Sequence, residues 1–349
     1  MLHRISRQSL QMGLACVTCL ALFAGCAAPG GATAPTPVAM TDDDHQAATE
    51  QVETLPVLTP VTLAAGEKLR VVATTNIVGD VVRQVGGDAI ELVQLLPPGT
   101  DPHSYQARPD DLRALNQAHV VFVNGLHLEE AMAPVLESLD SGAPVIAVNI
   151  GVTPLELQEE HADDAADDHH HEGADPHTWM DVRNVEQWVA NIAAVLSALD
   201  PAHATAYAAN ATAYTAELTA LHEEIATTLA SVPAAQRKLV TDHDNLGYLA
   251  HAYGLTIVGA VIPSLSTMAA PSAQELAALQ QQITQEGVKA ILVGNTVNPA
   301  VAQQIARDTG AVVTSIYTDS LSGADGPAAT YLEMMRYNLA QIVAALTAK

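Results

Sequence analysis

Residues 200–233 read DPAHATAYAANATAYTAELTALHEEIATTLASVP, and this stretch decides the fold. Its larger apolar residues recur at spacings of three and four, which places one apolar stripe along a helix. The stripe consists of Tyr207, Ala211, Tyr214, Leu218, Leu221, Ile225 and Leu229. The DP at 200–201 suits the start of such a helix and the SVP at 231–233 suits its end. At about 1.5 Å per residue the helix is roughly 30 Å long or longer. The alternative is two shorter helices with a break near residues 208–210.

Short apolar runs alternate with amphipathic ones on both sides of this helix. Before it, strands are expected at residues 69–74, 91–96, 119–124 and 144–148, with helices at 77–85, 109–117 and 128–139. After it, strands are expected at residues 237–241, 256–261, 288–293 and 311–316. Apolar strands that alternate with helices are typical of parallel sheets covered by helices. The predicted fold is therefore α/β, with two lobes on parallel sheets joined by a long rigid helix.

The chain begins with an export signal. Arg4 and Arg7 precede an apolar run at residues 12–23, which is shorter than the roughly 20 residues of a membrane span. The run ends in LFAGC at residues 22–26, which resembles a bacterial lipobox. Residues 1–26 are therefore predicted to be a lipoprotein signal peptide, and Cys26 is the predicted lipidation site. The alternative is an ordinary secretory signal that is cut nearby. In either case the protein is exported, and a lipid anchor would hold it at the cell membrane, facing the periplasm or the outside.

The net charge and the cysteine positions restrict which partners and which kind of metal site the chain can have. The chain has 349 residues with 14 basic and 39 acidic side chains, a formal net charge of −25. Such a surface repels nucleic acid and concentrates cations, although the acidity could also serve solubility alone. Cys16 and Cys19 lie in the signal, so Cys26 alone remains and no thiolate site or internal disulfide can form. Any bound metal must be held by nitrogen and oxygen.

The remaining boundaries follow from local composition. Residues 27–66 are rich in Ala, Pro, Thr and Gly and are predicted to form a disordered tether. Residues 67–199 form the expected N-terminal lobe, 200–232 the connecting helix and 233–349 the C-terminal lobe. Within the first lobe, residues 159–175 contain eight carboxylates and no basic residue. The same segment holds four histidines: His161, His169, His170 and His171. This loop is predicted to be a low-affinity, accessory metal-collecting arm; the alternative is an incidental low-complexity insertion.

Four other residues are candidate metal ligands. The motif Asp-Pro-His occurs twice, ending at His103 and at His177, and a proline-fixed bend presents each imidazole. His243 follows a predicted strand and Asp319 follows another. Ligand groups gather at the carboxyl ends of parallel strands, so two groups from each lobe could meet in a cleft. Three imidazoles and one carboxylate suit four-coordinate zinc, whereas manganese prefers more carboxylate and a higher coordination number. Ordinary structural or surface roles are expected for His119, His127, His203, His222 and His251.

Four ordered motifs carry a resemblance to a known family. They are LLPPGTDPHSY with PDDL (95–105 and 109–112), ADPHTWMD (174–181), TDHDNLGYLA with AYGL (241–250 and 252–255) and YTDSL (317–321). They resemble the motifs of the zinc/manganese-binding lipoproteins of bacterial ABC importers, over about residues 69 to 347. The resemblance implies two lobes joined by a rigid helix, with metal ligands His103, His177, His243 and Asp319. Manganese members of that family tend to carry Glu at the third ligand position and zinc members His, often with a His-rich acidic loop. Asn295 stands where many members have Glu.

These observations lead to one functional prediction and three alternatives. The prediction is a monomeric solute-binding protein, not an enzyme, that captures Zn²⁺ between two lobes and delivers it to an ABC permease with its ATPase. The nearest alternative is a manganese-binding member of the same family. A metal buffer or surface adhesin without a transporter is another. A zinc hydrolase would need an open fourth position for water, which Asp319 is expected to fill, and the sequence contains no His-Glu-x-x-His motif.

Overall fold

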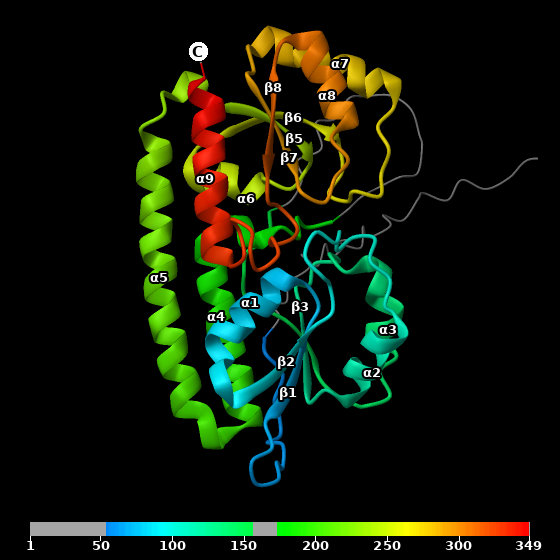
Figure 1. The fold of residues 1–349 in the computed structure, drawn as a ribbon, viewed down its shortest axis with the longest axis vertical. Helices are drawn as coiled ribbons and strands as arrows, with labels where there is room; N and C mark the ends of the chain where they lie inside the picture. Colours follow the sequence, from blue (N-terminus) through cyan, green and yellow to red (C-terminus); the bar gives the residue numbers. More distant parts are fainter. Residues whose placement is uncertain (1–53, 156–172, 349) are drawn as a thin grey trace, which may run out of the picture. The chain divides into compact units, whose positions relative to one another are not determined.

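Two four-stranded parallel sheets organise the chain in the computed structural model, which describes residues 54–155 and 173–348 (Figure 1). The first sheet has the order β2-β1-β3-β4. Its strands are β1 (Leu69–Ala73), β2 (Ile90–Gln94), β3 (Val120–Val123) and β4 (Val145–Ala147). The second sheet has the order β6-β5-β7-β8. Its strands are β5 (Lys238–His243), β6 (Thr256–Ile262), β7 (Ala290–Gly294) and β8 (Val312–Ile316). Each predicted strand overlaps one of these eight.

The central strands are apolar along their length because helices cover both faces of each sheet. In β3, Val120 and Phe122 pack in one hydrophobic cluster while Val121 and Val123 pack in another. This alternation follows from the two-residue period of a strand, which sends successive side chains to opposite faces. In the second sheet, neighbouring residues of β7 divide in the same way between two clusters. Buried faces on both sides explain why the strand sequences are nearly continuous apolar runs.

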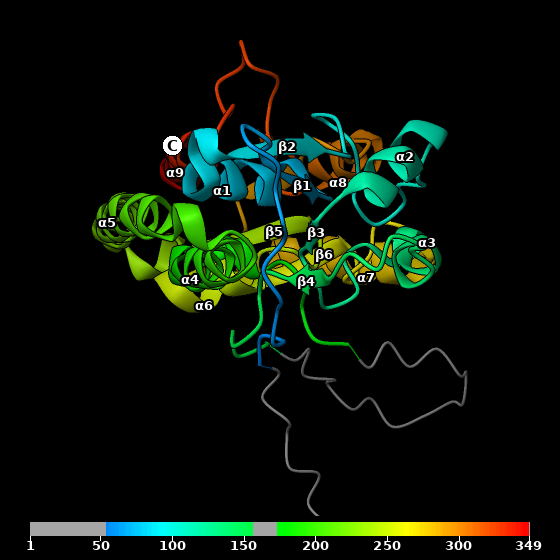
Figure 2. The ribbon, with the colours of Figure 1, turned by 90° about the horizontal axis from the view of Figure 1, so that it is seen from below.

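Helices of the first lobe lie on both sides of its sheet. Figures 1 and 2 show α1 (Asn76–Gly86) and α4 (Val182–Leu199) on one side and α2 (Pro109–Gln117) and α3 (Ala133–Glu137) on the other. The prediction of a helix over residues 128–139 was wrong in extent: a 3₁₀ turn at Glu130–Met132 leads into the five-residue α3. Leu126 and His127 adopt positive φ angles of 52° and 61°, a conformation that non-glycine residues rarely take, and the helix starts only after this turn.

Helices also cover the sheet of the second lobe. Its helices are α6 (Gly247–Tyr253), α7 (Ala273–Glu286), α8 (Ala300–Thr309) and α9 (Tyr331–Thr347). Helices α7 and α9 each begin with a reciprocal capping box, Ser272 with Glu275 and Thr330 with Glu333. Among the described residues, no helix combines the length and hydropathy needed to cross a bilayer.

The long helix α5 spans Ala204–Ala230, 27 residues without a break, so the alternative of two shorter helices was wrong. Six of the seven residues of its predicted stripe are buried, and Ala211 is half-buried. Helix α5 lies against α1 and α4 of the first lobe and against α6 and α9 of the second (Figure 1). The predicted fold class, α/β with two parallel-sheet lobes joined by a long helix, is confirmed.

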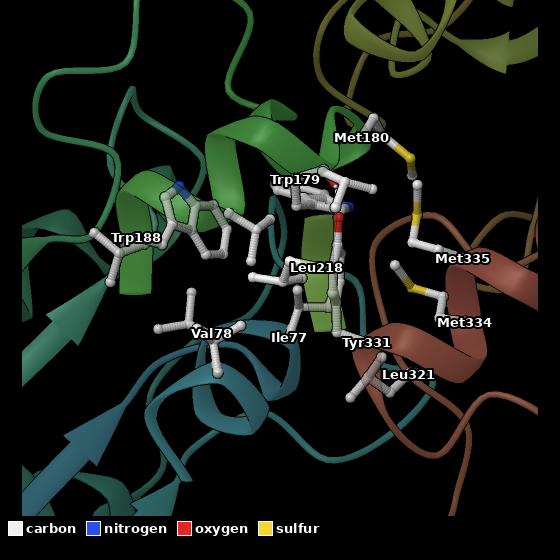
Figure 3. Packing of buried hydrophobic residues seen from close by; sticks show 14 of the residues in the cluster. Ile77, Val78, Trp179, Met180, Trp188, Leu218, Leu321, Tyr331, Met334 and Met335 are labelled. Carbon is white, nitrogen blue, oxygen red and sulfur yellow. Dashed lines mark hydrogen bonds between the residues drawn. The ribbon is translucent and has the colours of Figure 1, made fainter. Parts of the chain in front are cut away.

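One hydrophobic cluster joins the two lobes. Figure 3 shows Ile77 and Val78 of α1, Trp179, Leu218 of α5 and Tyr331 of α9 meeting in this core. Hydrogen bonds hold the same region. Tyr331 Oη donates to the Trp179 carbonyl (2.7 Å), and Trp179 Nε1 donates to the Thr318 carbonyl (2.8 Å). The core thereby fixes the backbone directly beside His177 and Asp319.

The segment expected to be a disordered tether is partly packed. From residue 54 onward the chain lies against the core, where Leu55, Leu58, Val61 and Leu63 contact the main hydrophobic cluster. The amide of Val61 also donates to the Leu199 carbonyl at 2.8 Å. These apolar residues explain why the tether prediction fails for residues 54–66. The predicted signal with Cys26 and the histidines at 161 and 169–171 lie outside the described residues.

Candidate metal centre

The structure brings the four predicted ligands together. His103 lies in the loop after β2, His177 after β4, His243 at the end of β5 and Asp319 after β8. All four are buried, and one ligand atom from each lies within 4.8 Å of the others. The carboxyl ends of the two parallel sheets therefore face one another across this point, as expected for ligand sites in open α/β sheets.

The ligand atoms face a common centre. His103 Nε2 and His177 Nε2 are 3.3 Å apart. Asp319 Oδ1 lies 3.8 Å from His177 Nε2 and 3.9 Å from His243 Nε2. Neither His243 Nε2 nor Asp319 Oδ1 has a hydrogen-bond partner among the described residues, although both atoms are buried. A buried polar atom without a partner costs about 1–3 kcal/mol, and a cation at this centre would satisfy both atoms.

Carboxylates behind two of the imidazoles fix their orientation. Asp175 Oδ1 lies 2.8 Å from His177 Nδ1, and Asp242 Oδ1 lies 3.0 Å from His243 Nδ1. Each carboxylate accepts the Nδ1 hydrogen, so Nε2 is the nitrogen that faces the centre and that a metal can take, the usual arrangement behind a metal-bound histidine. Asp175 was predicted to belong to the His-rich loop; the structure places it in a buried position beside His177 instead.

The two Asp-Pro-His motifs form the same local turn. Asp101 Oδ1 accepts from the His103 amide (3.0 Å), and Asp175 Oδ1 accepts from the His177 amide (2.9 Å). A short Asp side chain that bonds the backbone two residues onward is a standard turn device. The role of these aspartates was missed from the sequence, although the repeated motif signalled it. Asp242 was missed as well, and its place directly before His243 is the signal that could have found it.

Burial and charge set the protonation of the imidazoles. Burial, together with the neighbouring imidazoles, lowers the pKa of His103 to about 3 and that of His177 to about 3. Burial also acts to lower the pKa of His243, but the charges of Asp319 and Asp242 outweigh it and raise that pKa to about 9. At neutral pH two imidazoles are therefore neutral, while the third holds a proton among carboxylates. A divalent cation can take the place of that proton.

Hydrogen bonds join the two lobes near the site. Thr267 Oγ1, in the second lobe, donates to Asp101 Oδ2 at 2.7 Å. Asn76, at the start of α1, accepts from the Leu321 amide (2.8 Å) and donates to Ser320 Oγ (2.8 Å). The segment that carries Asp319 is thus bonded to the first lobe. A cavity of about 310 Å³ lies beside His103 and is lined also by His127, Glu130, Pro176, Ser264 and Ser266.

The other described histidines lie outside the cluster of four. His119 accepts from the Arg70 amide, His203 pairs with Asp200, and His222 lies 3.1 Å from the Tyr253 hydroxyl. His127 lines the cavity, and His251 is exposed on α6. Trp179 lies next to the cluster, with its ring centroid 5.3 Å from that of His177.

Comparison with known proteins matches residues 71–345 to the family described as Zinc-uptake complex component A periplasmic, ZnuA. The chain belongs to the ZnuA family. Its members are metal-binding solute-binding proteins rather than enzymes, and the resemblance predicted from the four motifs is confirmed. The described fold and the cluster of three histidines and one aspartate agree with this membership.

Several relatives of this ZnuA-family chain are named for a metal. The manganese-binding lipoprotein MntA of Halalkalibacterium halodurans is 31% identical over 283 residues, covering 81% of this chain and 90% of that protein. The periplasmic zinc-binding protein TroA from Treponema pallidum superposes with a TM-score of 0.73 at 30% identity, covering 81% of this chain and 100% of TroA. A Mn-bound periplasmic metal-binding protein from Candidatus Liberibacter asiaticus gives a TM-score of 0.70 at 31% identity, covering 80% of this chain and 100% of that one.

Proposed function

We propose that this protein captures Zn²⁺ with His103, His177, His243 and Asp319 and delivers it to the permease of an ABC importer. The observation that carries the proposal is the convergence of three imidazole Nε2 atoms and one carboxylate oxygen, two of them buried without a partner. In a buried site such a donor set is costly without a cation and favourable with one. The metal is cargo, and no reaction takes place on it.

The donor set favours zinc. Four-coordinate sites of nitrogen and oxygen ligands are common for Zn²⁺, whereas manganese favours oxygen ligands and octahedral geometry. Manganese is the second candidate, and a specific finding favours it. MntA of Halalkalibacterium halodurans is named as manganese-binding, and the Candidatus Liberibacter asiaticus structure is described as Mn-bound. These two names therefore point toward manganese, whereas the name of TroA and the ligand chemistry point toward zinc.

The proposal also includes a cellular location and protein partners. A relative from Streptococcus anginosus is named as a manganese ABC transporter substrate-binding lipoprotein. By analogy we infer that this chain is exported, is anchored to the membrane through lipidated Cys26, and works with a permease and its ATPase. The acidic loop with His161 and His169–His171 would collect metal weakly, so deletion of residues 160–172 would leave the affinity of the main site intact and lower the total zinc bound.

Metal competition tests the proposal directly. The purified protein is stripped with a chelator, titrated with Zn²⁺ and Mn²⁺ against a competing indicator, and examined by elemental analysis. His177→Ala removes one ligand and should abolish tight binding. His251→Ala removes an exposed imidazole on α6 and serves as the matched control, with unchanged affinity expected. Tight binding that survives in His177→Ala would overturn the ligand assignment, and preferential uptake of manganese by the wild-type protein would replace zinc as the cargo.

A further inference from the structure

This inference rests on the proposed function and concerns how the site chooses between metals. Asp319 presents its two oxygens to different environments. Oδ1 faces the imidazoles without a hydrogen-bond partner among the described residues. Oδ2 accepts from Thr296 Oγ1 at 3.0 Å and from Thr318 Oγ1 at 2.9 Å. We propose that Thr296 and Thr318 are specificity-determining residues, which hold Asp319 as a one-oxygen ligand and limit the metal to four coordination.

Lone-pair accounting supports this role. A carboxylate oxygen offers about two lone-pair sites, and two hydroxyl donors use both of those on Oδ2. Only Oδ1 is then free for a cation. For both oxygens to bind one metal, the carboxylate would have to give up at least one of these hydrogen bonds. Hydrogen bonds to a charged group are among the stronger ones in proteins, so the surrounding chain resists that change.

The chain around Thr318 holds its hydroxyl in place. Thr318 is fully buried, and its carbonyl accepts from Trp179 Nε1 at 2.8 Å. Its hydroxyl lies against Gly294 at the end of β7, where an added Cβ would overlap with Thr318 Oγ1. The Gly294 amide also donates to Asp242 Oδ2 at 2.7 Å. Glycine at 294 therefore leaves the space that the Thr318 hydroxyl occupies.

The consequence differs between the two candidate metals. Zinc is satisfied by three nitrogens and one oxygen in a tetrahedral arrangement. Manganese favours octahedral coordination rich in oxygen, and a second oxygen from Asp319 would be the nearest additional ligand. By holding Oδ2 away, the two threonines withhold that ligand from manganese. The three imidazole nitrogens and Asp319 Oδ1, which zinc needs, remain available.

The test compares metal selectivity in matched variants. Thr296→Val removes the hydroxyl at nearly the same shape, and Thr296→Ser keeps it. Wild type and both variants are titrated with Zn²⁺ and Mn²⁺, and each is also loaded with Co²⁺, whose visible absorption is more intense in tetrahedral than in six-coordinate sites. In Thr296→Val we expect the zinc-to-manganese affinity ratio to fall about tenfold or more, and the Co²⁺ bands to weaken. Thr296→Ser should keep the wild-type ratio and spectrum.

A second variant disturbs the other hydrogen bond to Asp319 Oδ2, the one donated by Thr318. Gly294→Ala should push the Thr318 hydroxyl away and lower the ratio as Thr296→Val does; circular dichroism verifies that each variant is folded. If the wild-type protein binds zinc but neither variant shifts the ratio or the Co²⁺ bands, the role of the threonines is overturned and the proposed function stands. A wild-type preference for manganese also overturns the role. If the wild-type protein binds none of the three metals tightly, the proposed function itself is overturned.

Discussion

Zinc binding should release protons, because the metal replaces a proton on His243. The pKa of His243 is about 9, so at pH 7 this imidazole is almost fully protonated and must become neutral before Nε2 can bind a metal. The difference between pH 7 and this pKa corresponds to a loss of apparent affinity of about 100-fold, or about 3 kcal/mol. Burial raises the pKa of Asp175 to about 7, so this carboxyl holds about half a proton at pH 7 and should lose it when His177 binds a cation. His103 and His177, with pKa values of about 3, contribute no protons above pH 5.

The expected release is therefore about 1 to 1.5 protons per zinc at pH 7, falling to about 0.5 at pH 9 as His243 becomes neutral in the metal-free protein. Isothermal titration calorimetry measures it, through the dependence of the binding enthalpy on the ionisation enthalpy of the buffer. The titration at pH 9, with zinc supplied from a chelator, is the internal control. Zero release at pH 7, or a release that grows between pH 7 and pH 9, would refute the reasoning about His243.

Three further predictions concern residues away from the metal itself. Asp175→Asn should weaken zinc binding about 10- to 100-fold, because a neutral amide supports the His177 imidazole less well, and an unchanged competition titration would contradict this. Tyr331→Phe removes the donor to the Trp179 carbonyl and should lower the free energy of unfolding in urea by about 1–3 kcal/mol; a stability equal to wild type would show that this bond is dispensable. Leu218→Ala should cost about 2–5 kcal/mol in the same assay, whereas the exposed neighbour Glu217→Ala should stay within about 0.5 kcal/mol, and equal effects would argue against the buried stripe on α5.

Periodicity predicted the fold well because the signals are local. The long helix was predicted over residues 200–232 and is found over Ala204–Ala230, and its apolar stripe is the buried face. The strands were found within a few residues because buried parallel strands are short apolar runs. The stretch at 128–139 is α-helical only from Ala133, because Pro134 lacks a backbone N–H and suits the first turn of a helix rather than its interior.

The four predicted ligands also had local signals, since each follows a strand or a proline turn. Some of the groups that support them did not. Thr318 directly precedes Asp319, but Thr296 bonds Asp319 from the loop after the neighbouring strand β7. Thr267 bonds Asp101 from 166 residues away, in the other lobe. No spacing rule connects the last two pairs, because these contacts depend on how the strands and lobes pack. Threonines are also common in loops and strand ends, so their residue type alone carries little information.

The position of Trp179 has a practical consequence. The chain contains two tryptophans: Trp179 lies edge-on to His177, next to the centre, and the ring centroid of Trp188 lies 6.4 Å from that of Trp179. Indole emission is sensitive to charge and polarity in its surroundings, and the arrival of a divalent ion changes both within a few ångströms. Intrinsic fluorescence should therefore follow loading and unloading in real time without a label, and stopped-flow mixing would give the rates of capture and release.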